Sequence, residues 1–165
     1  MSFGMYFWVG TPVGIDPLLA NQVGGDEQIS SEKLQAMSDQ LRQRLAENPN
    51  NAEGWVMLGR IERALARYDE ADVALQKALA LSRNDDVMIE RAELLAQKNN
   101  GEFKGEPWAI INKVLKSDPN NGNALLLAGS AAFSEGRFKE ALAHWEKVRA
   151  LLPASSPDMP ALAEA

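Results

Sequence analysis

The feature that most constrains this chain is a segment that occurs twice, 70 residues apart. The offset is the same at positions spread over 23 residues. A constant offset of this kind indicates an internal repeat rather than a chance similarity. The matched pairs are Pro49 and Pro119, Trp55 and Leu125, Tyr68 and Phe138, and Ala71 and Ala141.

Each copy has the pattern of two helices joined by a tight polar turn. In the second copy the turn lies at residues 134–137. Gly129 and Ala141 are small where bulk would be expected, so the two helices of the copy can approach closely. The copy is therefore predicted to be a helical hairpin. Its apolar residues recur at helical spacing before the turn (Leu125, Ala128, Gly129, Ala132) and after it (Ala141, Trp145, Val148).

A less regular copy lies between these two. Ile89 follows Trp55 by 34 residues and precedes Leu125 by 36. In the second helices the order of the two spacings reverses. Val114 follows Ala78 of the first copy by 36 residues and precedes Val148 of the last copy by 34. Two extra residues must therefore lie between the helices of the middle copy, within Gln97–Glu106. The sequence predicts three hairpins, over residues 52–83, 86–119 and 122–153.

These residues resemble the tetratricopeptide (TPR) family, whose pattern has an aromatic residue, a leucine and a glycine on the first helix and an alanine opening the second. The middle copy departs from the pattern at Glu93, where a small residue is usual, and at Pro107. The resemblance implies an all-α fold, a TPR α-solenoid of about three helical hairpins. The matching residues are Trp55, Leu58, Gly59, Tyr68, Ala71, Leu75 and Ala78 in the first copy, and Leu125, Gly129, Phe138, Ala141, Trp145 and Pro153 in the third.

A lone helix is predicted over residues 29–47, before the first hairpin. Ser30 or Ser31 caps it, and it ends at an Asn-Pro-Asn sequence like the one that precedes the third hairpin. Such a helix is expected to pack on the first hairpin and close that end of the stack, so the TPR domain spans residues 29–153. Its apolar stripe consists of Leu34, Met37, Leu41 and Leu45.

The two ends of the chain have a different composition. Residues 1–28 begin with the apolar and aromatic stretch Met1–Gly10 and continue as a tether rich in proline and glycine. The stretch is either a disordered or tag-derived start, or the exit end of a transmembrane helix with Tyr6 and Trp8 in the interfacial belt. The tail, residues 154–165, either forms one turn of helix against the third hairpin or stays loose.

Composition and chemistry narrow the function. The net charge of −6 and the pI near 4.9 argue against binding to nucleic acid or to an anionic membrane surface. The chain has no cysteine, and its single histidine, His144, has no partners spaced for metal binding or acid–base chemistry. No phosphate loop or nucleophile motif is present. We therefore predict a protein that is not an enzyme and needs no metal or cofactor.

The first helices of stacked hairpins line a concave groove, where a peptide or a helix can bind. The arginines predicted to lie there either grip a carboxylate of a partner or pair with nearby acids of the same surface. A rotation of 100° per residue from the buried positions predicts that the groove consists of Val56, Met57, Arg60, Arg63, Glu90, Arg91, Leu94, Leu126, Leu127, Ser130 and Phe133.

A narrower resemblance comes from the order of the segments: an apolar stretch with Gly10-Thr11-Pro12, a tether, an unpaired helix, and three repeats of which the last contains Ala-His-Trp-Glu-Lys-Val. This order is similar to the cytochrome c maturation proteins of the CcmI/CycH/NrfG kind. The resemblance implies a chaperone-like adaptor on the periplasmic side of the bacterial inner membrane. It further implies that the adaptor holds the C-terminal region of apocytochrome c and acts with haem lyase components, with an N-terminal anchor as its only link to the membrane.

Two alternatives stay open. One is a generic TPR scaffold in another envelope or cytoplasmic assembly. The other is self-association through the apolar stretch Met1–Val9.

Overall fold

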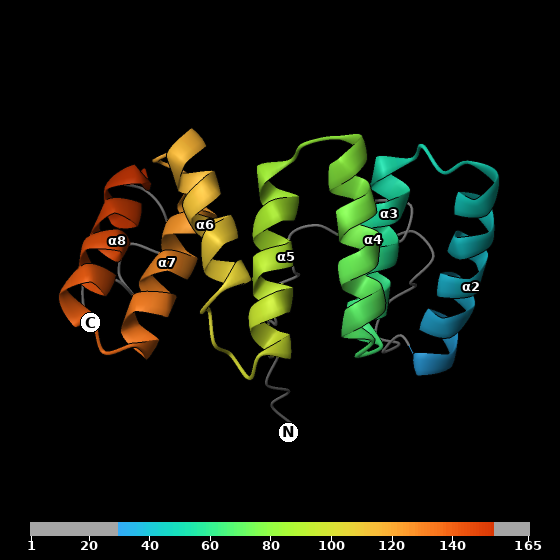
Figure 1. Cartoon of the computed structure of the whole chain (residues 1–165), viewed down its shortest axis with the longest axis horizontal. Coiled ribbons are helices and arrows are strands. Elements are labelled where there is room, and N and C mark those ends of the chain that lie inside the picture. The colour runs from blue at the N-terminus through green and yellow to red at the C-terminus, as the bar shows by residue number, and fades with distance from the viewer. Residues whose placement is uncertain (1–29, 154–165) are drawn as a thin grey trace, which may run out of the picture.

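The computed structural model describes residues 30–153, and every regular element within this range is an α-helix, which confirms the predicted all-α fold (Figure 1). The predicted N-terminal stretch (1–28) and tail (154–165) lie outside the described residues. The helices are α2 (Ser31–Glu47), α3 (Ala52–Ala64), α4 (Tyr68–Leu81), α5 (Asp85–Lys98), α6 (Glu106–Ser117), α7 (Gly122–Ser134) and α8 (Phe138–Leu151).

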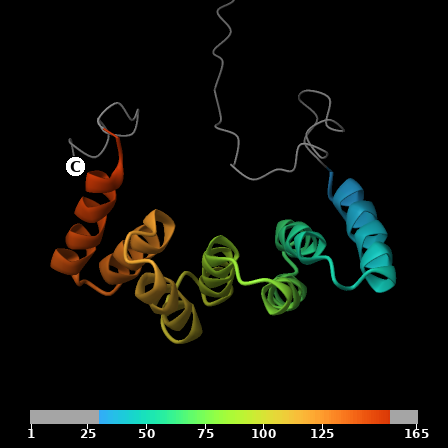
Figure 2. The same cartoon turned by 90° about the horizontal axis from the view of Figure 1, so that it is seen from above.

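The helices form three successive hairpins, α3/α4, α5/α6 and α7/α8, with α2 packed on the first. Figure 2 shows the stack as a shallow arc with α2 and α8 at its two ends. Both end helices turn toward the same side of the arc, and α3 lies nearer to that side than α4. We call the surface of α3, α5 and α7 on this side the inner face, and the opposite surface, to which α4 contributes, the outer face.

Close helix contact in the first and third hairpins depends on glycine. A Cβ atom placed on Gly59 would lie 2.8 Å from Cδ2 of Leu75, and one on Gly129 would lie 2.2 Å from Nε1 of Trp145. Real side chains do not approach this closely. The 70-residue repeat therefore preserves a contact of backbone against side chain, which explains why both copies have glycine there.

Each first helix begins with an asparagine cap. The side chains of Asn51 and Asn121 accept hydrogen bonds from the backbone N–H groups three residues later, both at 2.9 Å. Asn84 accepts from the backbone N–H groups of Asp86 and Val87, at 2.9 and 3.2 Å, and so caps α5 in the same way.

The middle hairpin has a longer turn than its neighbours. Residues 99–105 join α5 to α6, whereas three residues join the helices of each other hairpin, at 65–67 and 135–137. The extra residues are thus where the spacing of the repeats predicted them. Pro107 lies in the first turn of α6, where a missing N–H costs no helical hydrogen bond, and its side chain is buried.

Helix α2 is held on the first hairpin by an apolar contact and a buried polar network. Leu45 is buried in a cluster with Leu58 of α3 and Ala74 of α4. Beside it the carboxylate of Glu62, which is 0% exposed, accepts hydrogen bonds from the Ser38 hydroxyl and from Nη2 of Arg42 at 2.8 Å. Because both donors come from α2, the network joins α2 directly to α3.

The pKa of the Glu62 carboxyl is lowered from its ordinary value. Burial acts to raise this pKa, but the hydrogen bonds from Ser38 and Arg42 and the positive charges of Arg42 and Arg67 outweigh it. The carboxylate is therefore ionised although it is buried, and the network depends on its charge.

Among the described helices, none is both long enough and apolar enough to cross a membrane.

Candidate protein-binding surface

The first half of the inner face, on α3 and α5, is a row of paired polar side chains. Nε of Arg60 donates to Oε2 of Glu90 at 3.0 Å, and Nε of Arg63 donates to Oε1 of Gln97 at 3.0 Å. Arg63 also lies 3.5 Å from the carboxylate of Glu93. We call these five residues the charged row. They bridge two consecutive first helices.

The pairing limits what the two arginines of the charged row can offer to a partner. Their side chains are 46% and 36% exposed, and each is already matched with an acceptor on α5. Hydrogen bonding by Glu90 raises the pKa of Arg60, which partial burial alone would lower, so this arginine is charged at all relevant pH values. Such exposed pairs contribute little to stability, and a ligand carboxylate can compete for them.

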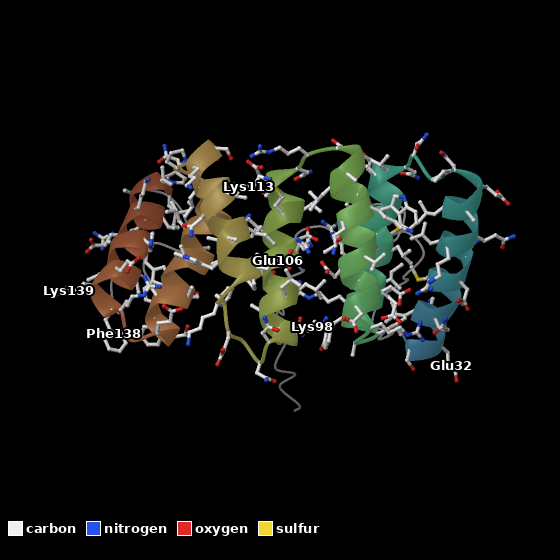
Figure 3. The ribbon with its side chains drawn as sticks, viewed as in Figure 1. Glu32, Lys98, Glu106, Lys113, Phe138 and Lys139 are labelled. Atoms are coloured by element: carbon white, nitrogen blue, oxygen red, sulfur yellow. The ribbon has the colours of Figure 1, made fainter. Side chains whose placement is uncertain are left out.

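Two residues predicted for the groove, Arg91 and Leu94, do not lie on it. Leu94 is 0% exposed and packs in a core cluster with Ala71 and Leu75 of α4. Nε of Arg91 lies 2.5 Å from Oδ1 of Asp72, on α4. Nη2 of Arg91 lies 2.7 Å from Oε1 of Glu106, which Figure 3 labels at the start of α6. The prediction for these two positions was wrong.

Glu93 explains why Arg91 and Leu94 lie away from the inner face. The repeat pattern places a small buried residue at this position, but burying an unpaired carboxylate costs several kcal/mol. The face of α5 that carries Glu90, Glu93 and Gln97 therefore lies toward α3 and solvent, and the adjacent face carries Leu94 and Arg91 toward α4 and α6. Glu93 and Gln97 were missed as inner-face residues, although the charge at a small-residue position was a signal for them.

The second half of the inner face, on α7, is apolar. Leu126 and Phe133 are 44% and 54% exposed, and Leu127 packs partly against the core. The hydroxyl of Ser130, between them, donates to the backbone oxygen of Leu126 at 3.0 Å. The Phe133 ring extends the apolar surface onto α8, since it contacts the ring of Phe138 edge-on at a centroid distance of 5.3 Å. Large exposed apolar side chains that cluster in this way are typical of binding surfaces.

The other predicted groove residues, Val56 and Met57, are half-buried on α3, and Val56 packs against a core cluster. His144 is also half-buried. Among the described residues no group of three or more histidine, aspartate or glutamate side chains could hold a metal ion. The described inner face is thus a surface with a charged half and an apolar half.

Comparison with known proteins agrees with this architecture. The family described as "Cytochrome c-type biogenesis protein H TPR domain" matches residues 17–159. This range contains all seven helices described above and part of the tether before them.

Two of three individual relatives carry similar names. The chain is 32% identical over 131 residues to the cytochrome c-type biogenesis protein CcmH of Escherichia coli K12, a match that covers 77% of this chain and 37% of the relative. It is 30% identical over 125 residues to CycH of Pseudomonas aeruginosa, covering 75% and 31%. It is 31% identical over 117 residues to the formate-dependent nitrite reductase complex subunit NrfG of Escherichia coli O157:H7, covering 70% and 57%. The chain thus corresponds to only part of the length of each of these proteins.

Solved structures resemble the stack of hairpins. The structure titled "Crystal structure of MamA" superposes with a TM-score of 0.61 at 19% identity and covers 70% of this chain and 67% of that one. A second MamA structure has a TM-score of 0.57 at 24% identity. At this level of identity the likeness shows the fold alone.

Proposed function

The chain belongs to the family of cytochrome c-type biogenesis protein H TPR domains, and from this premise we propose that it acts in cytochrome c maturation as a non-catalytic adaptor that binds the C-terminal region of apocytochrome c. The family and the names of two relatives, CcmH and CycH, support the role in cytochrome c maturation. In this proposal the adaptor presents apocytochrome c to haem lyase components. The work takes place on the periplasmic side of the inner membrane.

The two halves of the inner face carry this proposal. An amphipathic helix binds to a groove through apolar anchors spaced along one face, with polar residues at the edges. On α7, Leu126 and Phe133 provide exposed apolar contacts. On α3 and α5, the charged row provides paired groups that a terminal carboxylate or a polar helix edge can enter. A short helical segment that ends in a carboxylate matches both halves at once.

The test is calorimetric titration of the full chain with synthetic peptides that match the C-terminal helix of several c-type cytochromes. Leu126→Glu and Phe133→Glu each place a charge where an apolar anchor is expected, and we expect at least tenfold weaker binding from either, because central apolar anchors dominate such interfaces. The matched control is Val73→Glu, which changes a residue of similar exposure on α4 and is expected to leave binding within about twofold.

The charged row is tested by exchange rather than by removal. The double variant Arg60→Glu/Glu90→Arg keeps a pair between α3 and α5 but reverses its direction, so it separates pairing from recognition. A loss of peptide binding in this variant, with unchanged thermal unfolding, supports a contact between the row and the peptide. If folded wild-type chain binds none of the peptides, the proposal fails and a scaffold in another assembly takes its place.

A further inference from the structure

The end of the helix stack at α8 exposes an apolar stripe. Phe138 and Leu142 are 61% and 55% exposed, and Trp145 is partly buried beside them. Because these residues follow one another at spacings of four and three positions, their side chains lie on one face of the helix. Helix α8 is the last described helix of the arc, and no described helix lies beyond it (Figure 2). We call these three residues, together with Arg149 one turn later, the α8 stripe.

The spacing of the α8 stripe is the same when it is counted from either end of the helix. Phe138 precedes Leu142 by four positions, and Trp145 precedes Arg149 by four. When a second copy of α8 lies antiparallel, Leu142 of each copy can therefore face Trp145 of the other. In the same register Phe138 of each copy faces Arg149 of the other, and a guanidinium over an aromatic ring is a favourable contact. The stripe is thus complementary to itself.

The charged residues beside the stripe favour the same antiparallel arrangement. Lys139, labelled in Figure 3, and Glu146 are exposed and lie two turns apart along one edge of the stripe. Neither of them pairs with another residue of the described range 30–153. A two-fold axis between antiparallel helices brings this edge of both copies to the same side, running in opposite directions. Lys139 of each copy then lies near Glu146 of the other, whereas in a parallel pair the two charges stay two turns apart.

We propose that α8 is a homodimerisation helix, which packs antiparallel on α8 of a second copy with Leu142 and Trp145 next to the two-fold axis. A closed contact of this kind covers the exposed stripe of both copies at once. A head-to-tail contact with α2 of another copy fits less well, because the exposed side chains of α2, such as Glu32 and Lys33, are largely polar. One pair of helices buries less than about 1,200 Å², so we expect a weak dimer that dissociates on about hundredfold dilution.

The dimer is tested by sedimentation velocity of the full chain over a range of concentrations. Leu142→Glu places a charge at the centre of the stripe and is expected to weaken dimerisation by at least about tenfold. The matched control is Val73→Glu, which adds the same charge at an apolar residue of similar exposure on α4. It is expected to dimerise like the wild type, and circular dichroism shows whether each variant keeps its helices.

Charge exchange tests the antiparallel register. Lys139→Glu and Glu146→Lys each bring like charges together at two places, so we expect either variant to weaken dimerisation about fivefold. The double variant Lys139→Glu/Glu146→Lys restores both pairs and is expected to dimerise like the wild type. An equimolar mixture of the two single variants is also expected to recover, because a mixed dimer places opposite charges together at both positions.

A wild-type chain that stays monomeric at the highest concentration overturns the proposal. So does dimerisation that survives Leu142→Glu, because it would then use another surface. Single charge variants that dimerise like the wild type contradict the antiparallel register, as does failure of the double variant or of the mixture to recover. No peptide is present in these measurements, so their result is independent of the function proposed above.

Discussion

The two ends of the helix stack are finished in different ways. At the N-terminal end, α2 covers the first hairpin, and its exposed side chains on the far side are largely polar. At the C-terminal end, α8 exposes Leu142 and Phe138, which are 55% and 61% exposed; Figure 3 labels Phe138 at the beginning of α8. A stack of hairpins needs a polar outer surface on its terminal elements to stay soluble. Among the described helices, α2 thus presents the polar exterior that a terminal element needs, whereas α8 leaves large apolar side chains exposed.

The largest effect is expected from removing the apolar contact that fastens α2. Leu45→Ala deletes a side chain that is buried between α3 and α4, and a change of this type costs about 2–5 kcal/mol of unfolding free energy. Leu142→Ala makes the same chemical change at the other end and is expected to cost below about 1 kcal/mol, because Leu142 is exposed. Urea unfolding measures both. Equal losses would contradict the difference between the ends.

The next largest effect is expected from the close helix contacts inside the first and third hairpins. Gly129→Ala forces a methyl group against the rigid indole of Trp145 and is expected to cost about 1–3 kcal/mol, as overpacking does. Gly59→Ala meets the flexible end of Leu75, which can move, and alanine also favours the helix. Its cost is expected to be smaller. Thermal unfolding of the two variants provides the test, and a larger loss for Gly59→Ala would reverse the comparison.

A smaller effect is expected from the polar part of the α2 junction. Arg42→Ala removes a donor to the buried Glu62 carboxylate and is expected to cost about 1–2 kcal/mol, a value moderated by the exposure of Arg42. Arg44→Ala removes the same charge from an exposed position of the same helix and serves as the control. Hydrogen exchange of the α2 amides shows whether the loss is local. Similar exchange in both variants would mean that net charge, and not the network, holds α2.

The smallest effect concerns pH. The pKa of Glu62 is lower in the folded protein than its ordinary value of 4.5, so the ionised carboxylate stabilises the fold above that value. This contribution is lost as the pH falls through the folded pKa. Glu62→Gln does not titrate and is expected to be less stable than wild type by about 1 kcal/mol at pH 7, with the difference shrinking below pH 4.5. A difference that is the same at pH 3 and pH 7 would contradict an ionised Glu62.

Much of the fold follows from local features of the sequence. The asparagines before each first helix predict where these helices begin, since their side chains bond to free N–H groups of the first turn. The change of spacing from 34 to 36 residues located the longer turn of the middle hairpin. Gly129 indicated a close helix contact, because glycine leaves room for a large side chain opposite, and Gly59 occupies the same position in the first copy.

The candidate site was predicted less well, and the errors have a common cause. Arg91 and Leu94 were assigned to the groove by assuming that α5 is oriented like its neighbours. One residue, Glu93, invalidates that assumption by keeping its own face of α5 toward solvent and Arg63. The burial of Ser38 and Glu62 could not be predicted either, because both residues are polar and yet both are fully buried. Burial of a polar group depends on partners that lie far away along the chain.

The sequence by itself therefore determined the number of hairpins, the ends of their helices and the contacts that need glycine, because these depend on spacing and on the nearest residues along the chain. Only the tertiary structure decided the orientation of α5, the ionic link between α2 and α3, and the contrast between a covered and an exposed end. Those features depend on which charges find partners when distant segments meet, and pairing across 20 or more residues leaves no periodic trace in the sequence.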